Sequence, residues 1–270
     1  MLSYIILHLV QSNFITTFDF PSKIWQVHAH PNLPILILEF RNSETRTCSF
    51  TCLQMDSNQI LWSNPDLEED WWRGLETMDG DYAVFYGFED AQQPTRKGVF
   101  VLSLKTGAKV FFDENIFFDN IHQHILFYKK TNQEELLYGM DLRNLQHFEI
   151  VPSEIYYIKD TTNLQSPILV YPEDILFPKL MLLLEQHFPT HQVQMMEYLE
   201  TNKYLIISFS EKGNEQLNQH LLLINADGNL LIQEVLGISQ KGLLLGTFFV
   251  AHHHLVFVSK ENTLNYYLLI

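Results

Sequence analysis

The residues best suited to bind a ligand form a dense polar and aromatic segment, 66–76. It contains Trp71, Trp72, Arg73 and Glu76, with further acidic residues just before them. Indole rings stack on flat ligands, and a guanidinium adds cation–π contacts and hydrogen bonds. The segment therefore predicts a small-ligand site. The alternative is structural, with one tryptophan packed between neighbouring sheets and the acidic side chains in solvent.

A second candidate pair, Glu39 and Arg41, lies two residues apart in the apolar run 34–41. Because side chains alternate along a strand, both should face the same side. We expect Arg41 to pair with Glu39, or with the group formed by Arg73 and Glu76. These four residues would carry the reaction if the protein is an enzyme, for example a hydrolase or lyase acting on a sugar- or lactone-like molecule. The alternative is a structural ion pair at a strand end.

Neither a metal site nor a cofactor site is expected. The run 252–254 is three consecutive histidines, but neighbouring strand residues face opposite sides, and other repeats have a turn at this position. Cys48 and Cys52 share one face of an expected strand, about 13 Å apart at ~3.3 Å per residue, which is too far for a disulfide. We therefore expect a histidine turn and two free cysteines that fill apolar space.

The motifs of several enzyme classes are absent. There is no G-x-S-x-G, H-E-x-x-H, G-x-G-x-x-G or G-x-x-x-x-G-K-[ST]. Nothing in the sequence pairs two carboxylates across a cleft. We therefore expect a non-catalytic scaffold or binding module for a small molecule or a protein. The hydrolase or lyase remains the alternative.

A repeat supplies the elements that must position these residues. Five apolar segments align with one another, and they begin at Pro34, Tyr82, His124, Tyr204 and Leu255. Their starts lie 48, 42, 80 and 51 residues apart, and the gap of 80 splits into 43 and 37 at a degenerate sixth copy, 167–172. A period of about 40–50 residues with several short strands per unit is typical of a β-propeller. We expect one all-β propeller domain over residues 1–270, with six blades, or five if the degenerate copy is not a blade, and residues 1–12 peripheral or disordered.

The second repeat shows how four strands make one blade, at 71–78, 82–88, 98–104 and 108–112. The last repeat ends after its third strand, so we expect the run 14–20 to supply the fourth. This closes the ring and covers an exposed edge. The degenerate copy at 167–172 is the fourth repeat in chain order. The apolar run 174–187 that follows it is bounded by prolines and predicts a short helix.

The composition restricts the partners. The chain has 32 acidic and 17 basic residues, a formal net charge of −15. Nucleic acid is not expected as a partner because phosphate binding needs basic surface, and anionic membranes are disfavoured for the same reason. No apolar run reaches 18 residues, and the apolar start lacks the basic region and cleavage site of a signal peptide. We expect a cytoplasmic protein.

Several short motifs also follow one another in a recognisable order. They are Lys23-Ile24-Trp25, Leu38-Glu39-Phe40-Arg41, Leu61-Trp62, Trp71-Trp72-Arg73-Gly74-Leu75-Glu76, Gly98-Val99-Phe100, Lys105-Thr106-Gly107, the run 167–172 and the run 241–249. This order resembles a Bacteroidetes family known as a domain of unknown function, over most of the chain from about Phe14 onward. The resemblance implies a propeller-like repeat. It brings no activity, cofactor or catalytic residue.

Overall fold

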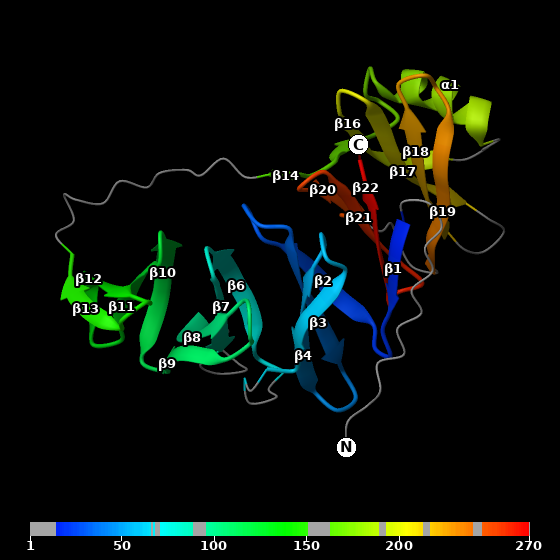
Figure 1. Cartoon of the computed structure of the whole chain (residues 1–270). Helices are drawn as coiled ribbons and strands as arrows, with labels where there is room; N and C mark the ends of the chain where they lie inside the picture. The colour runs from blue at the N-terminus through cyan, green and yellow to red at the C-terminus, as the bar shows by residue number, and fades with distance from the viewer. Residues whose placement is uncertain are drawn as a thin grey trace. The chain divides into compact units, whose positions relative to one another are not determined.

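A computed structural model describes residues 15–65, 67, 71–88, 96–150, 163–188, 193–212, 217–239 and 245–269. These residues form β-strands and one helix, which confirms the all-β expectation (Figure 1). The chain divides into a three-sheet unit, Ser22–Thr162, and a two-sheet unit made of Met1–Pro21 and Asn163–Ile270. In the described part, five antiparallel sheets have four or five strands each.

The three-sheet unit contains three four-stranded sheets, each a meander of consecutive strands. The first sheet is β2 (Ile24–Ala29), β3 (Ile35–Asn42), β4 (Thr47–Gln54) and β5 (Gln59–Ser63), the second is β6 (Gly74–Asp79), β7 (Tyr82–Phe88), β8 (Arg96–Ser103) and β9 (Lys109–Asp113), and the third is β10 (Ile116–His122), β11 (Ile125–Lys130), β12 (Gln133–Asp141) and β13 (Gln146–Glu149).

The two-sheet unit contains two five-stranded sheets and the helix. One sheet has the strand order β15-β16-β17-β18-β19, and the other has the order β1-β22-β21-β20-β14. The elements are β1 (Ile15–Asp19), β14 (Leu164–Gln165), β15 (Ile168–Val170), α1 (Phe177–His187), β16 (Val193–Glu200), β17 (Tyr204–Lys212), β18 (Leu217–Asn225), β19 (Leu230–Ser239), β20 (Phe248–Ala251), β21 (His254–Ser259) and β22 (Thr263–Leu268).

The five aligned apolar segments become β3, β7, β11, β17 and β21, each in the interior of its sheet. The first six residues of β3 are all buried, as expected for a strand covered on both faces. Residues of β3 and β4 pack against residues of β7 and β8 in one core cluster, where the ring of Phe50 on β4 meets the ring of Phe85 on β7 edge to face at 4.8 Å. The repeat therefore marks an interior strand of each sheet.

Tight turns connect consecutive strands, including those that the sequence predicts between residues 78 and 82 and at the run 252–254. Gly80 and the pair His252 and His253 have positive φ values of 52°, 48° and 63°, as two-residue hairpin turns require. The turn between β10 and β11 lies at Gln123 and His124, which have positive φ values of 48° and 72°. His252 and His253 therefore form a hairpin turn, as the sequence predicts for the run 252–254.

The prediction for the run 14–20 is confirmed. Strand β1 pairs antiparallel with β22, so that Phe18 lies opposite Leu264, and β1 completes the last sheet from the other end of the chain. Phe18 is 1 % exposed and its ring stacks on Tyr266 at 6.1 Å. Without β1, the backbone of β22 would be an open edge of the sheet.

The degenerate copy at 167–172 differs from the expectation. It forms no sixth sheet in the described part of the chain. Instead β15, which lies within this copy, pairs with β16 and becomes an edge strand of that sheet, while β14, which lies just before the copy, pairs with β20 of the other sheet. Only β14 and β15, with two and three residues, are regular, and such short strands are stable only when they add to an existing sheet.

The expected helix is present, although it starts three residues later than the run 174–187. In α1, Pro178 occupies the first turn, where its missing N–H has no helical partner to lose. The buried side chains Leu180 and Leu184 pack with Phe209 of β17. The helix therefore covers the five-stranded sheet that begins with β15 (Figure 1).

Candidate functional site

The pair Glu39 and Arg41 forms as the strand spacing predicts. Arg41 Nε lies 2.5 Å from Glu39 Oε1, and the two side chains are 12 % and 4 % exposed, with Arg41 the more exposed. Both lie on β3, whose alternation points them to one side. The pair is therefore largely buried within the three-sheet unit.

Arg41 also fastens two sheets together. Its Nη1 donates to the carbonyl of Trp71 at 2.6 Å, and its Nη2 donates to the carbonyl of Arg73 at 2.9 Å. Both carbonyls belong to the segment that leads into β6, the first strand of the next sheet. All three nitrogens of the guanidinium thus bind protein atoms, and the structural alternative accounts for this residue.

The carboxylate of Glu39 stays charged in this setting. Burial by itself raises the pKa of Glu39, but hydrogen bonding to His28 and Arg41 and the charges of both outweigh it, so the pKa lies below its usual value of 4.5. The His28 Nε2 atom is 3.5 Å from the second carboxylate oxygen. A carboxylate with a lowered pKa is a poor general acid near neutral pH.

Two tryptophans enclose the Arg41 guanidinium. Its Cζ lies 5.2 Å from the ring of Trp71 and 5.9 Å from the ring of Trp25, both within cation–π range. Trp25 is 59 % exposed, an unusual state for so large an apolar side chain. We call Trp25, Arg41 and Trp71 the tryptophan stack. Trp25 was not among the site residues predicted from the sequence, which gave no sign that β2 presents it to solvent.

The other predicted residues serve neighbouring contacts. Arg73 Nε donates to the carbonyl of Leu67 at 3.2 Å, and its Cζ lies 3.8 Å from the Phe100 ring. The Trp72 ring meets Phe88 edge to face at 6.0 Å. The acidic residues 66 and 68–70 lie outside the described residues.

Glu76 does not join Arg41, as one alternative predicted, but pairs with Arg96. The Arg96 Nη1 atom lies 2.7 Å from Glu76 Oε2, and Arg96 also stacks on the Tyr86 ring at 4.5 Å. The Arg96 side chain is 57 % exposed, so this is a surface pair. The sequence suggested one site for Glu76 and Arg73 because they are close in the chain. In the structure, the pairing of the strands instead brings Arg96, at the start of β8, within reach of Glu76 on β6.

In the two-sheet unit, a buried carboxylate also connects two sheets through hydrogen bonds to backbone atoms. Glu197 on β16 is 2 % exposed and accepts hydrogen bonds from the backbone N–H groups of Gly246 and Thr247 at 2.5 and 2.9 Å. These two residues precede β20, the strand that follows in the other sheet. In both units, therefore, hydrogen bonds with one side chain fix the segment that enters a neighbouring sheet.

The described residues contain no cluster of three or more histidine, cysteine or acidic side chains arranged to hold a metal ion. Cys48 and Cys52 are both free and buried, as expected. Burial raises the pKa of the Cys52 thiol to about 12. Both cysteines therefore belong to the core.

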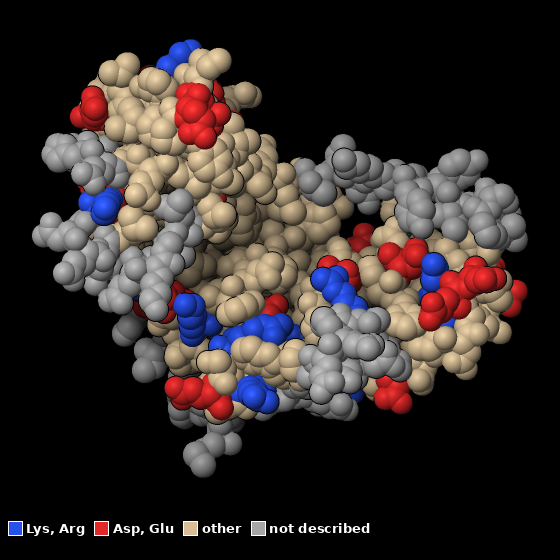
Figure 2. Space-filling view, turned by 180° about the vertical axis from the view of Figure 1, so that it is seen from behind, with Lys and Arg blue, Asp and Glu red and all other residues tan. Residues whose placement is uncertain are grey.

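The charged side chains form separate small groups on the surface shown in Figure 2. Acidic groups lie beside several of the basic ones on this face. In the described part of the chain, no helix has the length and apolar character needed to cross a membrane.

Comparison with known proteins gives two findings and one negative result. Residues 29–111 match the model of a family described as Domain of unknown function (DUF4905). The chain is also similar to a solved structure, "The crystal structure of BamB from Moraxella catarrhalis". The identity is 10 %, the coverage is 90 % of this chain and 84 % of that one, and the TM-score is 0.22. No curated protein matches the chain.

The family match covers β3 to most of β9 and so contains Glu39, Arg41 and the segment 71–76. It begins after Lys23-Ile24-Trp25 and stops before the run 167–172, so it covers only the motifs between 38 and 107 of the order that carried the resemblance. The matching family has no described activity, so it assigns no role to these residues.

Proposed function

We propose that this protein is a non-catalytic binding module of the β-propeller type, with each antiparallel sheet as one blade of a single domain. Five sheets of four or five strands support five blades. The completion of the last sheet by β1 also supports the proposal, because propellers commonly join their two chain ends in one blade. Six blades have less support, since the run 167–172 adds β15 to a sheet that already has four strands.

The tryptophan stack is the proposed recognition surface. The observation that carries this assignment is the contrast between Arg41, whose three guanidinium nitrogens bind protein atoms, and Trp25, which is 59 % exposed beside it. The arginine holds the indole in place from the protein side. A fixed, exposed aromatic ring favours binding of a flat ring in a small molecule, or of an apolar side chain of a protein partner.

The geometry favours this function over the alternative hydrolase or lyase. Such an enzyme would need acidic groups converging on one pocket with one pKa raised. Glu39 is instead buried, ion-paired and lowered in pKa, and Glu76 is paired with Arg96 at the surface. If the enzyme were nevertheless correct, Glu76→Gln would abolish turnover without unfolding the protein.

A thermal-shift screen tests the proposal with sugars, nucleotides, amino acids and divalent metals as probes. A ligand that binds only the folded state stabilises it by about 2.7 kcal/mol at a hundredfold excess over its dissociation constant. We expect a probe that raises the melting temperature of the wild type and of Tyr171→Ala, but not of Trp25→Ala. Tyr171 is a control because it is an exposed aromatic residue, 42 % exposed, in the other unit.

The screen also has a clear negative result. A hit that persists in Trp25→Ala would refute the tryptophan stack as the site. If no probe binds, affinity capture from a lysate with wild type and Trp25→Ala tests the protein-partner form of the proposal. Identical captured proteins with both baits would refute it.

A further inference from the structure

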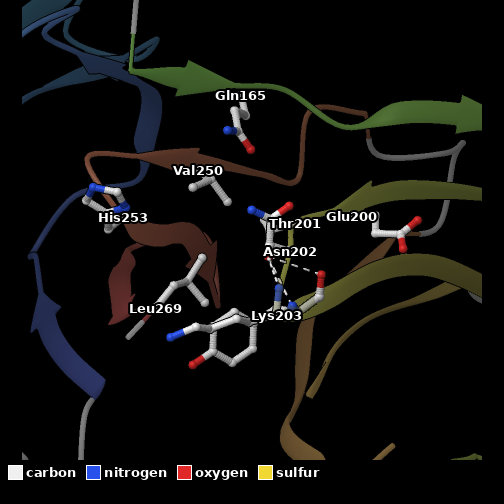
Figure 3. Close-up of a pocket in the computed structure, with 9 residues that line it drawn as sticks. Gln165, Glu200, Thr201, Asn202, Lys203, Val250, His253 and Leu269 are labelled. Atoms are coloured by element: carbon white, nitrogen blue, oxygen red, sulfur yellow. Dashed lines mark hydrogen bonds between the residues drawn. The ribbon is translucent and has the colours of Figure 1, made fainter. Parts of the chain in front are cut away.

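The two-sheet unit contains a hollow that is lined by none of the residues of the tryptophan stack (Figure 3). Its volume is about 440 Å³, within the range of small-molecule sites, about 300–1,000 Å³. Separate chain segments meet there. They are Gln165 on β14, the turn between β16 and β17, Val250 on β20, His253 in the turn between β20 and β21, and Leu269 after β22. No single stretch of sequence could indicate this site.

The hollow is held in shape by its own turns. The Thr201 N–H donates to the Tyr204 carbonyl at 2.8 Å, and the Tyr204 N–H donates to Thr201 Oγ1 at 3.0 Å. Elsewhere in the lining, the Leu269 N–H donates to the His253 carbonyl at 2.7 Å. These bonds fix the lining segments, so a ligand would lose little affinity to ordering the protein.

The lining combines an apolar floor with one cation. Val250 is buried, and Leu269 and Tyr204 are half-buried and belong to the same apolar cluster. Lys203 lies at the rim, and Figure 3 shows its side chain extending toward the side where Leu269 lies. Among the described residues, no hydrogen bond or ion pair engages the Lys203 ammonium group.

The one acidic residue in the lining is turned elsewhere. The Glu200 carboxylate accepts a hydrogen bond from the Tyr198 hydroxyl, and Figure 3 shows it pointing away from the hollow. The formal charge that faces the hollow is therefore positive, in a protein with a net charge of −15. A ligand carboxylate could therefore pair with Lys203 without competition from an acidic side chain of the lining.

We propose that this hollow binds a small organic monocarboxylate with an apolar or aromatic body. The carboxylate pairs with Lys203, and the apolar body lies on Val250, Leu269 and Tyr204. A phosphate fits less well, because the lining contains neither an arginine fork nor a helix N-terminus to neutralise a second charge. This proposal concerns a different unit from the tryptophan stack, so either can fail without the other.

Titration of phenylacetate into ¹⁵N-labelled protein, followed by amide chemical shifts, tests the proposal. About ten non-hydrogen atoms at ordinary ligand efficiency give a dissociation constant on the order of 1 mM. We expect shifts at the Thr201–Tyr204 turn and at Leu269. Acetate, which lacks the ring, should bind at least about tenfold more weakly because its binding buries almost no apolar area.

The charge requirement is tested separately with Lys203→Gln. This variant should weaken phenylacetate binding about fivefold, the upper end for an exposed ion pair, and leave binding of the neutral phenylacetamide unchanged. Lys179→Gln, which removes an exposed lysine on α1, should bind like the wild type. Because Lys203 is exposed, its replacement should not affect folding.

Three results would overturn the inference. The first is that the amides around the hollow do not shift with phenylacetate at about ten times its expected dissociation constant. Acetate binding as tightly as phenylacetate would indicate an adventitious ion only. Equal affinities of wild type and Lys203→Gln for phenylacetate would show that Lys203 does not hold a carboxylate.

Discussion

Replacing Arg41 by methionine should destabilise the three-sheet unit much more than a typical surface change. Methionine keeps an unbranched apolar side chain but has no donor. It removes the bond to Glu39 and the two bonds to the carbonyls of Trp71 and Arg73. The buried Glu39 carboxylate, 4 % exposed as a side chain, then loses its cation.

The expected cost is about 3–5 kcal/mol, because breaking a buried ion pair leaves an uncompensated charge in a poorly solvated place. Glu39→Gln alone should cost about 1–3 kcal/mol, since the amide still accepts one hydrogen bond but carries no charge. In the double variant the uncompensated charge is gone. Its cost should therefore fall short of the sum of the single costs by about 0.5–3 kcal/mol.

The penalty should depend on pH. In the wild type the Glu39 pKa is lowered, so the pair adds stability above the ordinary pKa of about 4.5, and this stability is lost as the pH falls through the folded-state value. In Arg41→Met, the hydrogen bond and the charge of Arg41 no longer lower the pKa of Glu39, so this pKa should be higher than in the wild type. The folded variant then takes up a proton more readily, and the difference from wild type should be largest at pH 7 and smaller near pH 4.

Urea unfolding followed by tryptophan fluorescence measures this cost in the relevant unit. All four tryptophans of the chain, Trp25, Trp62, Trp71 and Trp72, lie in the three-sheet unit and report on it alone. Arg143→Met is the matched control. It breaks the ion pair between Arg143 and Asp141, and because the Arg143 side chain is 63 % exposed, the unfolding midpoint should change little. A loss below about 1 kcal/mol for Arg41→Met, or an equal loss at both pH values, would refute the reasoning.

Two further predictions concern a turn and the thiols. Gly107→Ala should lower the free energy of unfolding by about 1–3 kcal/mol more than Gly228→Ala. Both glycines have positive φ, but only at Gly107 would the new Cβ come within 2.8 Å of Trp62 Cγ. Equal unfolding midpoints of the two variants would contradict this. Cys48 and Cys52 should resist a thiol reagent at about pH 8 in the folded protein and react fully in urea, because the Cys52 pKa is raised to about 12 and both side chains are buried; stoichiometric labelling without urea would show that the core opens.

Local pattern predicted much of the strand layout. The segment 82–88 coincides with β7, because an apolar run between two turn signals defines a strand without reference to distant residues. The same argument found β1, since the last repeat lacked a strand and the N-terminal run could supply one. For the segment 167–172 the sequence left open whether it forms a sixth blade, because its apolar pattern indicates a strand but does not specify which edge that strand joins.

The candidate site, too, could be predicted from the sequence only in part. Glu39 and Arg41 could be paired from sequence because they share one face of one strand, and this relation is local. The bonds from Arg41 to the carbonyls of Trp71 and Arg73 could not be predicted, because they cross between sheets and use backbone atoms, which carry no residue-specific signal. The exposure of Trp25 depends equally on what packs beside β2.

The sequence by itself determined the all-β class, the approximate strands, the turns and the acidic charge, because these follow from periodicity, turn chemistry and composition. Only the tertiary structure decided which polar groups are already bound to the protein and which remain available to a ligand. That difference separates Arg41, enclosed by its own chain, from Lys203, which faces a hollow built from distant segments. The physical reason is that hydrogen-bond satisfaction and cavity shape depend on pairings between residues far apart in the chain.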